Sequence, residues 1–267
     1  METWQIILLG IIQGVTEFLP ISSSGHLILA PLVFDFQDQG LALDAILHIA
    51  TLFAIIIFFR TDLLVLFRSL LKKKDPSGHK QIAWTIIWAS FPAGLGGLAF
   101  GDFIEENMRS PVLVASSLFL WSIVFWWADR MADQNKSPVH KIQNIGVKKI
   151  LIIGVAQTLA LIPGTSRSGI TIAAGLFGGI AKETATRFSF LLGTPIILGA
   201  GLYKIVDIMG HLDQVGYSPT QIFIGFIISF SVGYASIKLL MAIVAKVGLL
   251  PFIIYRIALA IIIFFTV

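Results

Sequence analysis

The sequence predicts an all-α integral membrane protein with two inverted-topology repeats, six transmembrane helices and two re-entrant helical hairpins. Its 267 residues are 56% hydrophobic and 13% charged, with a mean hydropathy of +0.88, whereas soluble domains carry roughly 25% charged residues. Long continuous apolar runs, rather than the ~10-residue alternation of barrel strands, favour helices. A third observation, a broken helix in each half of the chain, predicts the hairpins and the repeats.

The first hairpin is expected at the N-terminus. Residues 4–19 are apolar but hold Gln13 and Glu17, and the run breaks at Pro20 and the polar segment from Ser22 to Gly25. The apolar residues 27–34 reach about 12 Å as a helix, less than half of the roughly 30 Å hydrocarbon core. We therefore expect a helix that enters the membrane, breaks and returns, inside protein or against a wet cavity.

Three spans complete the first half of the chain. They are expected at residues 45–59, 82–100 and 112–127. Asp44, His48 and Thr51 are spaced to share one helix face, which we expect to turn inward. Basic residues cluster between positions 60 and 80 and again between 130 and 149. The positive-inside rule places both basic loops in the cytoplasm.

The second half repeats this order. An apolar run over residues 150–162 breaks at the segment from Pro163 to Gly169, and the next run is again too short to span. The remaining segments are expected to be a half-helix over 170–180, spans over 182–203, 222–241 and 249–267, and a polar loop over 204–219.

An ungapped alignment of the two halves supports an internal repeat. It pairs Gly10 with Gly154, Gln13 with Gln157, Ser22 with Ser166, Ser24 with Ser168 and Gly25 with Gly169. We expect one membrane domain with repeat one at 1–128, a cytoplasmic linker at 129–148 and repeat two at 149–267. Because each repeat holds three spans, the second copy enters the membrane upside down, and the two breaks meet near the midplane.

The two breaks together predict an anion site. Gln13 and Glu17 share a helix face that points toward the first break. Each break opens a half-helix, whose free N–H groups and positive dipole end favour an anion, and Arg167 adds a guanidinium suited to phosphate oxygens. The predicted substrate-binding residues are Gln13, Ser22, Ser24, Gly25, Ser166, Ser168, Gly169 and Thr171.

A glutamate beside that anion predicts a cation or a proton. With phosphates present, Mg²⁺ or Ca²⁺ held by Glu17 and Gln13 together with the substrate is the simplest interpretation. Ionisable side chains at membrane depth are costly and indicate function, and this applies to Glu17 and His26 alike.

These residues resemble a known family. The stretches from Gln13 to His26 and from Pro163 to Thr171, supported by 188–192 and 251–256, closely resemble undecaprenyl-diphosphate phosphatase, the bacitracin-resistance protein of bacterial inner membranes. The resemblance implies hydrolysis of a C55 isoprenyl diphosphate to its monophosphate, which recycles the lipid carrier for peptidoglycan synthesis. It also implies a divalent cation and a site open to the periplasm. The family's first motif is Glu/Gln-x-x-x-Glu, and this chain carries the variant with Gln13.

Catalytic roles follow as hypotheses. Arg167 is expected to neutralise charge on the transferred phosphoryl group. Glu17 binds the metal or accepts a proton, and His26 relays a proton. The nucleophile is Ser23, His26 or a water, and the sequence does not choose among them.

Two other functions compete with hydrolysis. A polyprenyl-phosphate flippase or secondary transporter would share inverted repeats and broken helices, and a structural subunit would leave the buried Glu17 and Arg167 unexplained. The basic residues flank apolar helices, so no nucleic-acid partner is expected. The expected partner is the membrane lipid substrate, and a homodimer is left open. The absence of cysteine excludes thiolate chemistry.

Overall fold

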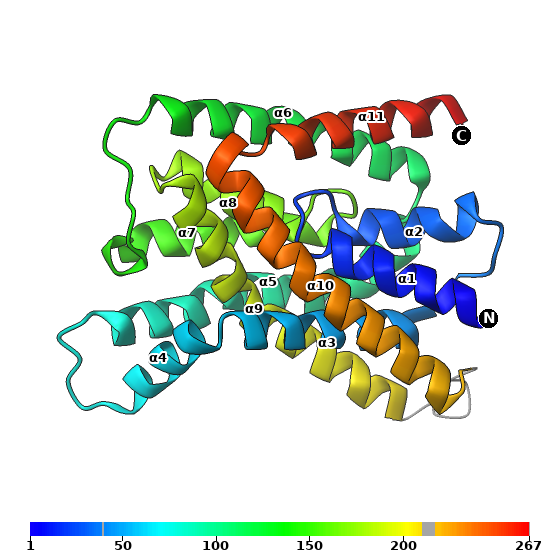
Figure 1. The fold of residues 1–267 in the computed structure, drawn as a ribbon, viewed down its shortest axis with the longest axis horizontal. Coiled ribbons are helices and arrows are strands. Elements are labelled where there is room, and N and C mark those ends of the chain that lie inside the picture. The colour runs from blue at the N-terminus through cyan, green and yellow to red at the C-terminus, as the bar shows by residue number, and fades with distance from the viewer. Residues whose placement is uncertain (39, 210–216, 267) are drawn as a thin grey trace.

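The protein is entirely helical in its described parts (Figure 1). The computed structural model describes residues 1–38, 40–209 and 217–266. Residues 210–216 of the polar loop expected over 204–219 therefore lie outside the described residues. The α-helices in these ranges are α1 Thr3–Thr16, α2 Ser23–Val33, α3 Gly40–Phe58, α4 Arg60–Leu71, α5 His79–Asn107, α6 Pro111–Gln134, α7 Val147–Thr158, α8 Arg167–Phe177, α9 Lys182–Met209, α10 Pro219–Val247 and α11 Leu250–Thr266. Two short 3₁₀ helices, η1 Ile142–Asn144 and η2 Leu159–Leu161, flank α7.

Four helices are long and apolar enough to cross a membrane, which confirms an all-α integral membrane protein. They lie at His79–Asn107, Pro111–Gln134, Lys182–Tyr203 and Pro219–Val247. A fifth candidate is the pair Ala42–Phe58 and Arg60–Leu71, whose axes bend by 82° at the break between them. The last helix, α11, has 17 residues and falls just short of the length expected for a full crossing.

The expectation of a basic loop after residue 59 was wrong in part. Residues from Arg60 to Leu71 form α4, and the lysine run begins only after that helix. Leu63, Leu66 and Leu70 recur at helical spacing and pack against the core. This apolar stripe was hidden by the charges around it. The helix α9 also continues past the expected end at residue 203 to Met209, because the segment remains largely apolar.

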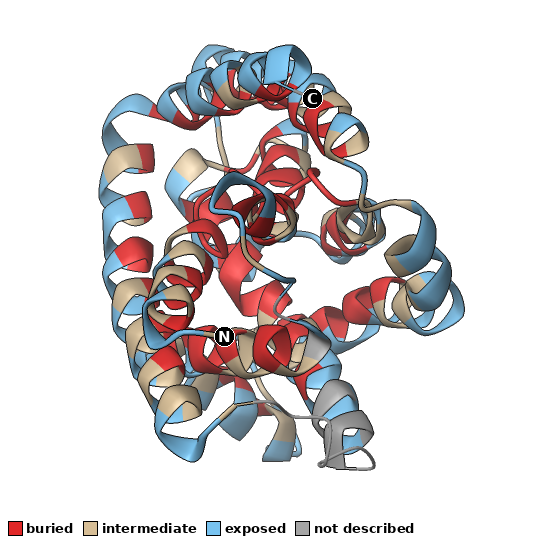
Figure 2. Cartoon of the chain, turned by 90° about the vertical axis from the view of Figure 1, so that its right-hand side faces the viewer, coloured by how far each residue is buried: buried red, intermediate tan, exposed pale blue. Residues whose placement is uncertain are grey.

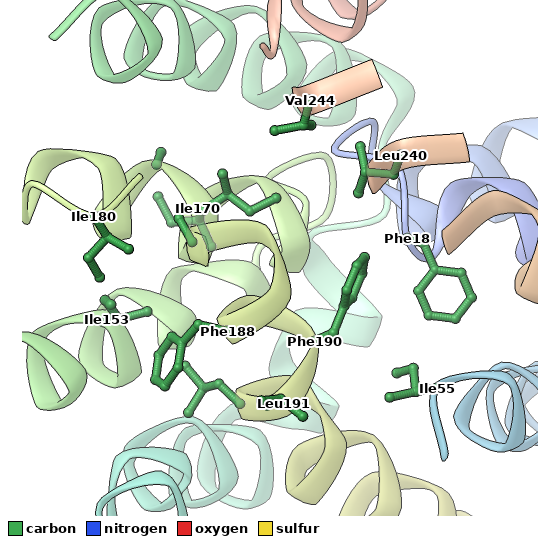
Figure 3. Packing of buried hydrophobic residues seen from close by; sticks show 14 of the residues in the cluster. Phe18, Ile55, Ile153, Ile170, Ile180, Phe188, Phe190, Leu191, Leu240 and Val244 are labelled. Atoms are coloured by element: carbon green, nitrogen blue, oxygen red, sulfur yellow. The ribbon is translucent and has the colours of Figure 1, made fainter. Parts of the chain in front are cut away.

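Buried residues lie on the inward sides of the helices and exposed residues on the outside of the bundle (Figure 2). Many of the exposed residues are large and apolar. Phe265, Leu71 and Val206 are 88%, 75% and 70% exposed, an arrangement suited to lipid rather than water. Inside, Phe190 packs edge-on against Phe18 with ring centroids 5.7 Å apart, and both lie in the main core cluster (Figure 3). Phe18 belongs to the first break, so the core supports that break directly.

Two broken helices lie where the hairpins are expected, and they are built alike. The first is α1 followed by α2, and the second is α7 and η2 followed by α8. Helices α2 and α8 each have 11 residues, about 16 Å of rise, which is too short to cross the hydrocarbon core. Each begins after a serine with positive φ, 75° at Ser22 and 76° at Ser166. The same backbone conformation thus recurs at both breaks.

Candidate active site

Glu17 lies at the C-terminal end of α1, where the first break begins, and it is 7% exposed. Its Oε1 accepts a hydrogen bond from Arg167 Nη2 at 2.8 Å, and Arg167 is the first residue of α8. The contact joins the two halves of the chain. The expected meeting of the acid and the guanidinium is therefore confirmed, and each neutralises the other's charge inside the protein.

The second carboxylate oxygen of Glu17 gathers three further side chains. Gln13 Nε2 donates to Oε2 at 3.1 Å, and Ser23 Oγ donates to the same oxygen at 2.8 Å. His48 Nε2 lies 3.5 Å from Oε2. Glu17 is thus the centre of a polar cluster drawn from α1, α2, α3 and α8, which includes three of the four proposed catalytic groups and both proposed metal ligands.

Ser22 closes the first break and starts α2. Its Oγ accepts from the backbone N–H of Gly25 at 3.3 Å and lies 3.3 Å from Ser24 Oγ. A Cβ on Gly25 would stand 3.0 Å from Val114 Cγ1, so glycine allows α6 to approach closely. Ser24 is exposed and Ser23 is half-buried. The hydroxyls of Ser23 and Ser24 are therefore the ones at this break that a ligand can reach.

The second break repeats the cap but buries it. Ser166 Oγ accepts from the N–H of Gly169 at 3.2 Å and lies 3.2 Å from Ser168 Oγ. Ser168 Oγ in turn donates to the carbonyl of Leu19 at 3.3 Å, and a Cβ on Gly169 would overlap the ring of Phe125. These side chains fix the second break against the first. Substrate contact by Ser166, Ser168 or Gly169 stays a prediction.

Thr171, one turn further along α8, is also buried and hydrogen-bonded within the protein. It is 1% exposed, and its Oγ1 donates to the carbonyl of Arg167 at 2.8 Å and lies 2.6 Å from Ser189 Oγ. Its hydroxyl is engaged behind Arg167 rather than at an open surface. A direct contact between Thr171 and substrate likewise stays a prediction.

His26 has a partner that sequence reasoning missed. Its Nδ1 is 2.7 Å from the carbonyl of Ser22, and its Nε2 is 2.7 Å from the hydroxyl of Tyr255. Because a carbonyl only accepts, Nδ1 carries the hydrogen, and in the neutral ring Nε2 accepts from the tyrosine. The two rings stack with centroids 5.7 Å apart. Tyr255 is 44% exposed, so the pair lies at the outer edge of the site.

The helix face of Asp44, His48 and Thr51, which was expected to turn inward, brings His48 to the site. His48 reaches Glu17, and its Nδ1 lies 2.7 Å from the Asp44 carbonyl. Arg187 does not join them, because its guanidinium pairs with Asp62 at 2.6 Å. That pair lines a separate polar cavity of about 250 Å³ together with His140, Gln143 and Glu183.

Two buried polar atoms at the site have no partner in the described protein. They are Gln13 Oε1 and Arg167 Nη1. A Cβ added to Gly193 would overlap the Arg167 guanidinium, so this glycine makes the space in which the guanidinium lies. An acceptor and a cationic donor left unpaired in one cluster fit a ligand with both a positive and a negative part. Among the described residues, no group of three or more His, Cys, Asp or Glu side chains forms a metal site.

Comparison with known proteins places the chain in a family. Residues 6–262 match the family described as "Bacitracin resistance protein BacA". The chain is also 41% identical over 262 residues to "Undecaprenyl-diphosphatase 2" of Stutzerimonas stutzeri (strain A1501), which covers 97% of this chain and 96% of the relative. The match includes both broken helices and the cluster around Glu17. The chain belongs to the bacitracin resistance protein BacA family.

Proposed function

We propose that this protein is a membrane phosphatase that hydrolyses undecaprenyl diphosphate to undecaprenyl phosphate and inorganic phosphate. Family membership and the name of the 41% identical relative support the substrate and the reaction. The observation that carries the proposal is the meeting of Glu17, at the end of α1, with Ser23 and Arg167, the first residues of the half-helices α2 and α8. An acid, a hydroxyl and a guanidinium beside free backbone N–H groups are the groups that phosphoryl transfer requires.

The same proposal includes a finer topology. We propose two inverted repeats, 1–128 and 149–267, joined by a cytoplasmic linker at 129–148. The six spans would be α3, α5, α6, α9, α10 and α11, and the two hairpins would enter from opposite faces. The basic loops after α4 and α6 put those ends in the cytoplasm, so the first hairpin opens to the periplasm of a bacterial inner membrane. Labelling of single introduced cysteines from one side of intact cells tests this orientation, because the chain has none of its own.

Ser23 is the proposed nucleophile. The Ser23 hydroxyl donates its hydrogen to Glu17 Oε2, so Glu17 is placed to act as the base. The lone pairs of Ser23 Oγ remain free to attack phosphorus. Ser23 Oγ attacks the terminal phosphorus while its proton passes to Glu17. The bond between that phosphorus and the bridging oxygen breaks, and undecaprenyl phosphate leaves with the electron pair. Water then attacks the phosphoserine, Glu17 returns the proton to Ser23 Oγ, and hydrogen phosphate is released.

Arg167 and His26 have separate proposed roles. The unpartnered Nη1 of Arg167 is the donor available to the terminal phosphate, and charge stabilisation of this kind is usually the largest catalytic contribution. His26 lies three residues after Ser23 on α2, hence on the same face of that helix. Together with Tyr255 it relays the proton that the attacking water loses.

A divalent cation fits the oxygen donors of the site. Gln13 Oε1, Glu17 and Ser23 Oγ would hold it, and the orphaned Gln13 Oε1 is the observation that favours an oxygen-seeking ion. When bound, Mg²⁺ or Ca²⁺ would supply positive charge to the diphosphate oxygens. Because Glu17 is the single carboxylate in this set, we expect weak metal binding, in the range that EDTA removes.

The decisive experiment measures phosphate release from C55 isoprenyl diphosphate by the purified protein in detergent. The protein should release phosphate, EDTA should abolish release, and Mg²⁺ or Ca²⁺ should restore it. Acid quenching with substrate labelled at the terminal phosphate should trap label on Ser23, and S23A should trap none. No release under any metal condition would contradict the proposal and favour the flippase alternative. Release without trapped label would identify water as the nucleophile.

A further inference from the structure

Arg256 is the largest fully buried side chain of the described residues, at 0% exposure in the apolar helix α11. No ion pair of Arg256 occurs within the described ranges, so no carboxylate explains its charge. Burying a guanidinium in an apolar interior is costly. The chain would keep such a residue for what it contacts.

The contacts of Arg256 join the two breaks. Its Nη1 donates to the carbonyl of Pro20 in the first break at 3.3 Å, and its Nη2 donates to the carbonyl of Gly164 in the second at 3.0 Å. Neither carbonyl belongs to a helix. Nη2 also reaches the Leu118 carbonyl at 3.3 Å, and Nε donates to Ser122 Oγ at 3.1 Å, which fastens the guanidinium to α6.

The rigid geometry of the guanidinium lets these contacts fix the distance between the two breaks. Its nitrogens are fixed in one plane, so the positions of Pro20 and Gly164 relative to each other follow from a rigid fork. Pro20 lies three residues after Glu17, and Gly164 lies three residues before Arg167. A shift at either carbonyl is passed along a few peptide bonds to one partner of the pair between Glu17 and Arg167.

We infer that Arg256 is a positioning residue that sets the distance between the two hairpin turns and thereby the alignment of Glu17 with Arg167. The inference rests on the proposed function for its catalytic consequence, although the spacing itself is independent of it. A lysine keeps the charge but offers one ammonium in place of the fork, so it does not hold both carbonyls in one plane.

The first test separates positioning from stability. We compare R256K with D129N, because Asp129 also fastens α11, through the N–H of Leu249 at 3.2 Å, but does so away from both breaks. In detergent, below the unfolding temperature of both variants, R256K should lower kcat about 100-fold with KM little changed, since misplacement by about 1 Å costs about that much. D129N should keep kcat within about threefold. Equal loss of kcat in the two variants, or an unchanged kcat in R256K, would overturn the inference.

The second test needs no activity. Cysteines introduced for Ser24 and Leu159, both exposed, carry spin labels on the two hairpins of this cysteine-free chain. The labelled parent should give one narrow distance distribution, and adding R256K should broaden or shift it, while adding D129N should not. An unchanged distribution in R256K would also overturn the inference. If the unlabelled protein with its own sequence releases no phosphate, the proposed function fails, and the distance measurement still decides the role of Arg256.

Discussion

Replacing Arg167 with lysine tests the core of the mechanism. Arg167 Nη2 is held by Glu17 at 2.8 Å, and Nη1 has no partner among the residues that the structure describes. Arginine can therefore hold Glu17 and the phosphate at once with different nitrogens, whereas the single ammonium of lysine must divide its hydrogen bonds between them. Loss of one donor to the developing charge costs about 2.7–4 kcal/mol, which is about 10²- to 10³-fold in kcat. The free energy of unfolding should fall by less than the roughly 3–5 kcal/mol that removal of one partner of a buried ion pair costs, because lysine keeps the positive charge.

The assay is phosphate release at saturating C55 diphosphate, with thermal unfolding measured on the same preparations. The matched control is R187K, because Arg187 likewise pairs with a carboxylate, that of Asp62, but is 46% exposed and outside the site. It should keep kcat near that of the parent, as expected for a pair with substantial solvent exposure. A kcat for R167K within threefold of the parent would show that the guanidinium fork has no catalytic role, and the proposed mechanism would be wrong.

Three further predictions concern the surroundings of Glu17. Q13E places a second carboxylate beside Glu17, where Gln13 Nε2 now donates at 3.1 Å. In EDTA the midpoint of thermal unfolding should be lower than that of the parent, and Mg²⁺ should raise it by more than in the parent. An equal response of the two midpoints to Mg²⁺ would count against a cation site here. G193A puts a methyl group where the Arg167 guanidinium lies, so kcat should fall by at least tenfold, with G199A, which meets no atom, as the control. Y255F removes the hydroxyl that lies 2.7 Å from His26 Nε2. The kcat should fall about 10²-fold while phosphoserine is still trapped, because the second step is slowed. Loss of trapping would place Tyr255 in the first step instead.

Much of the fold was predictable because lipid imposes a simple rule on sequence. Apolar runs that exclude charge mark helices, and breaks such as Pro20 to Ser22 stand out against them. The helix α4 was not predicted, since a short helix that carries charged residues resembles a basic loop when only charge is counted. The helix ends were also misjudged, because several helices, such as α5 and α10, extend beyond their apolar runs.

The site was predictable where the repeat made it so. Glu17 and Arg167 lie 150 positions apart, and only the matching breaks suggested that they meet. Tyr255 and Arg256 lie in α11, far along the chain from both breaks, and no local pattern shows which side of an apolar helix is buried. Gly193 gave no signal either, since the need for a missing Cβ appears only when the guanidinium above it is placed.

The two breaks are alike in backbone and unlike in chemistry, and this difference explains the charge balance of the site. Pairing Ser22 with Ser166 sets Ser23 opposite Arg167 and Glu17 opposite Leu161. One half thus contributes the acid and the hydroxyl, and the other contributes the cation. With one of each sign, the ligand-free protein satisfies both buried charges through the pair between Glu17 and Arg167. A phosphate anion that arrives with its cation can exchange partners with this pair without leaving either charge alone.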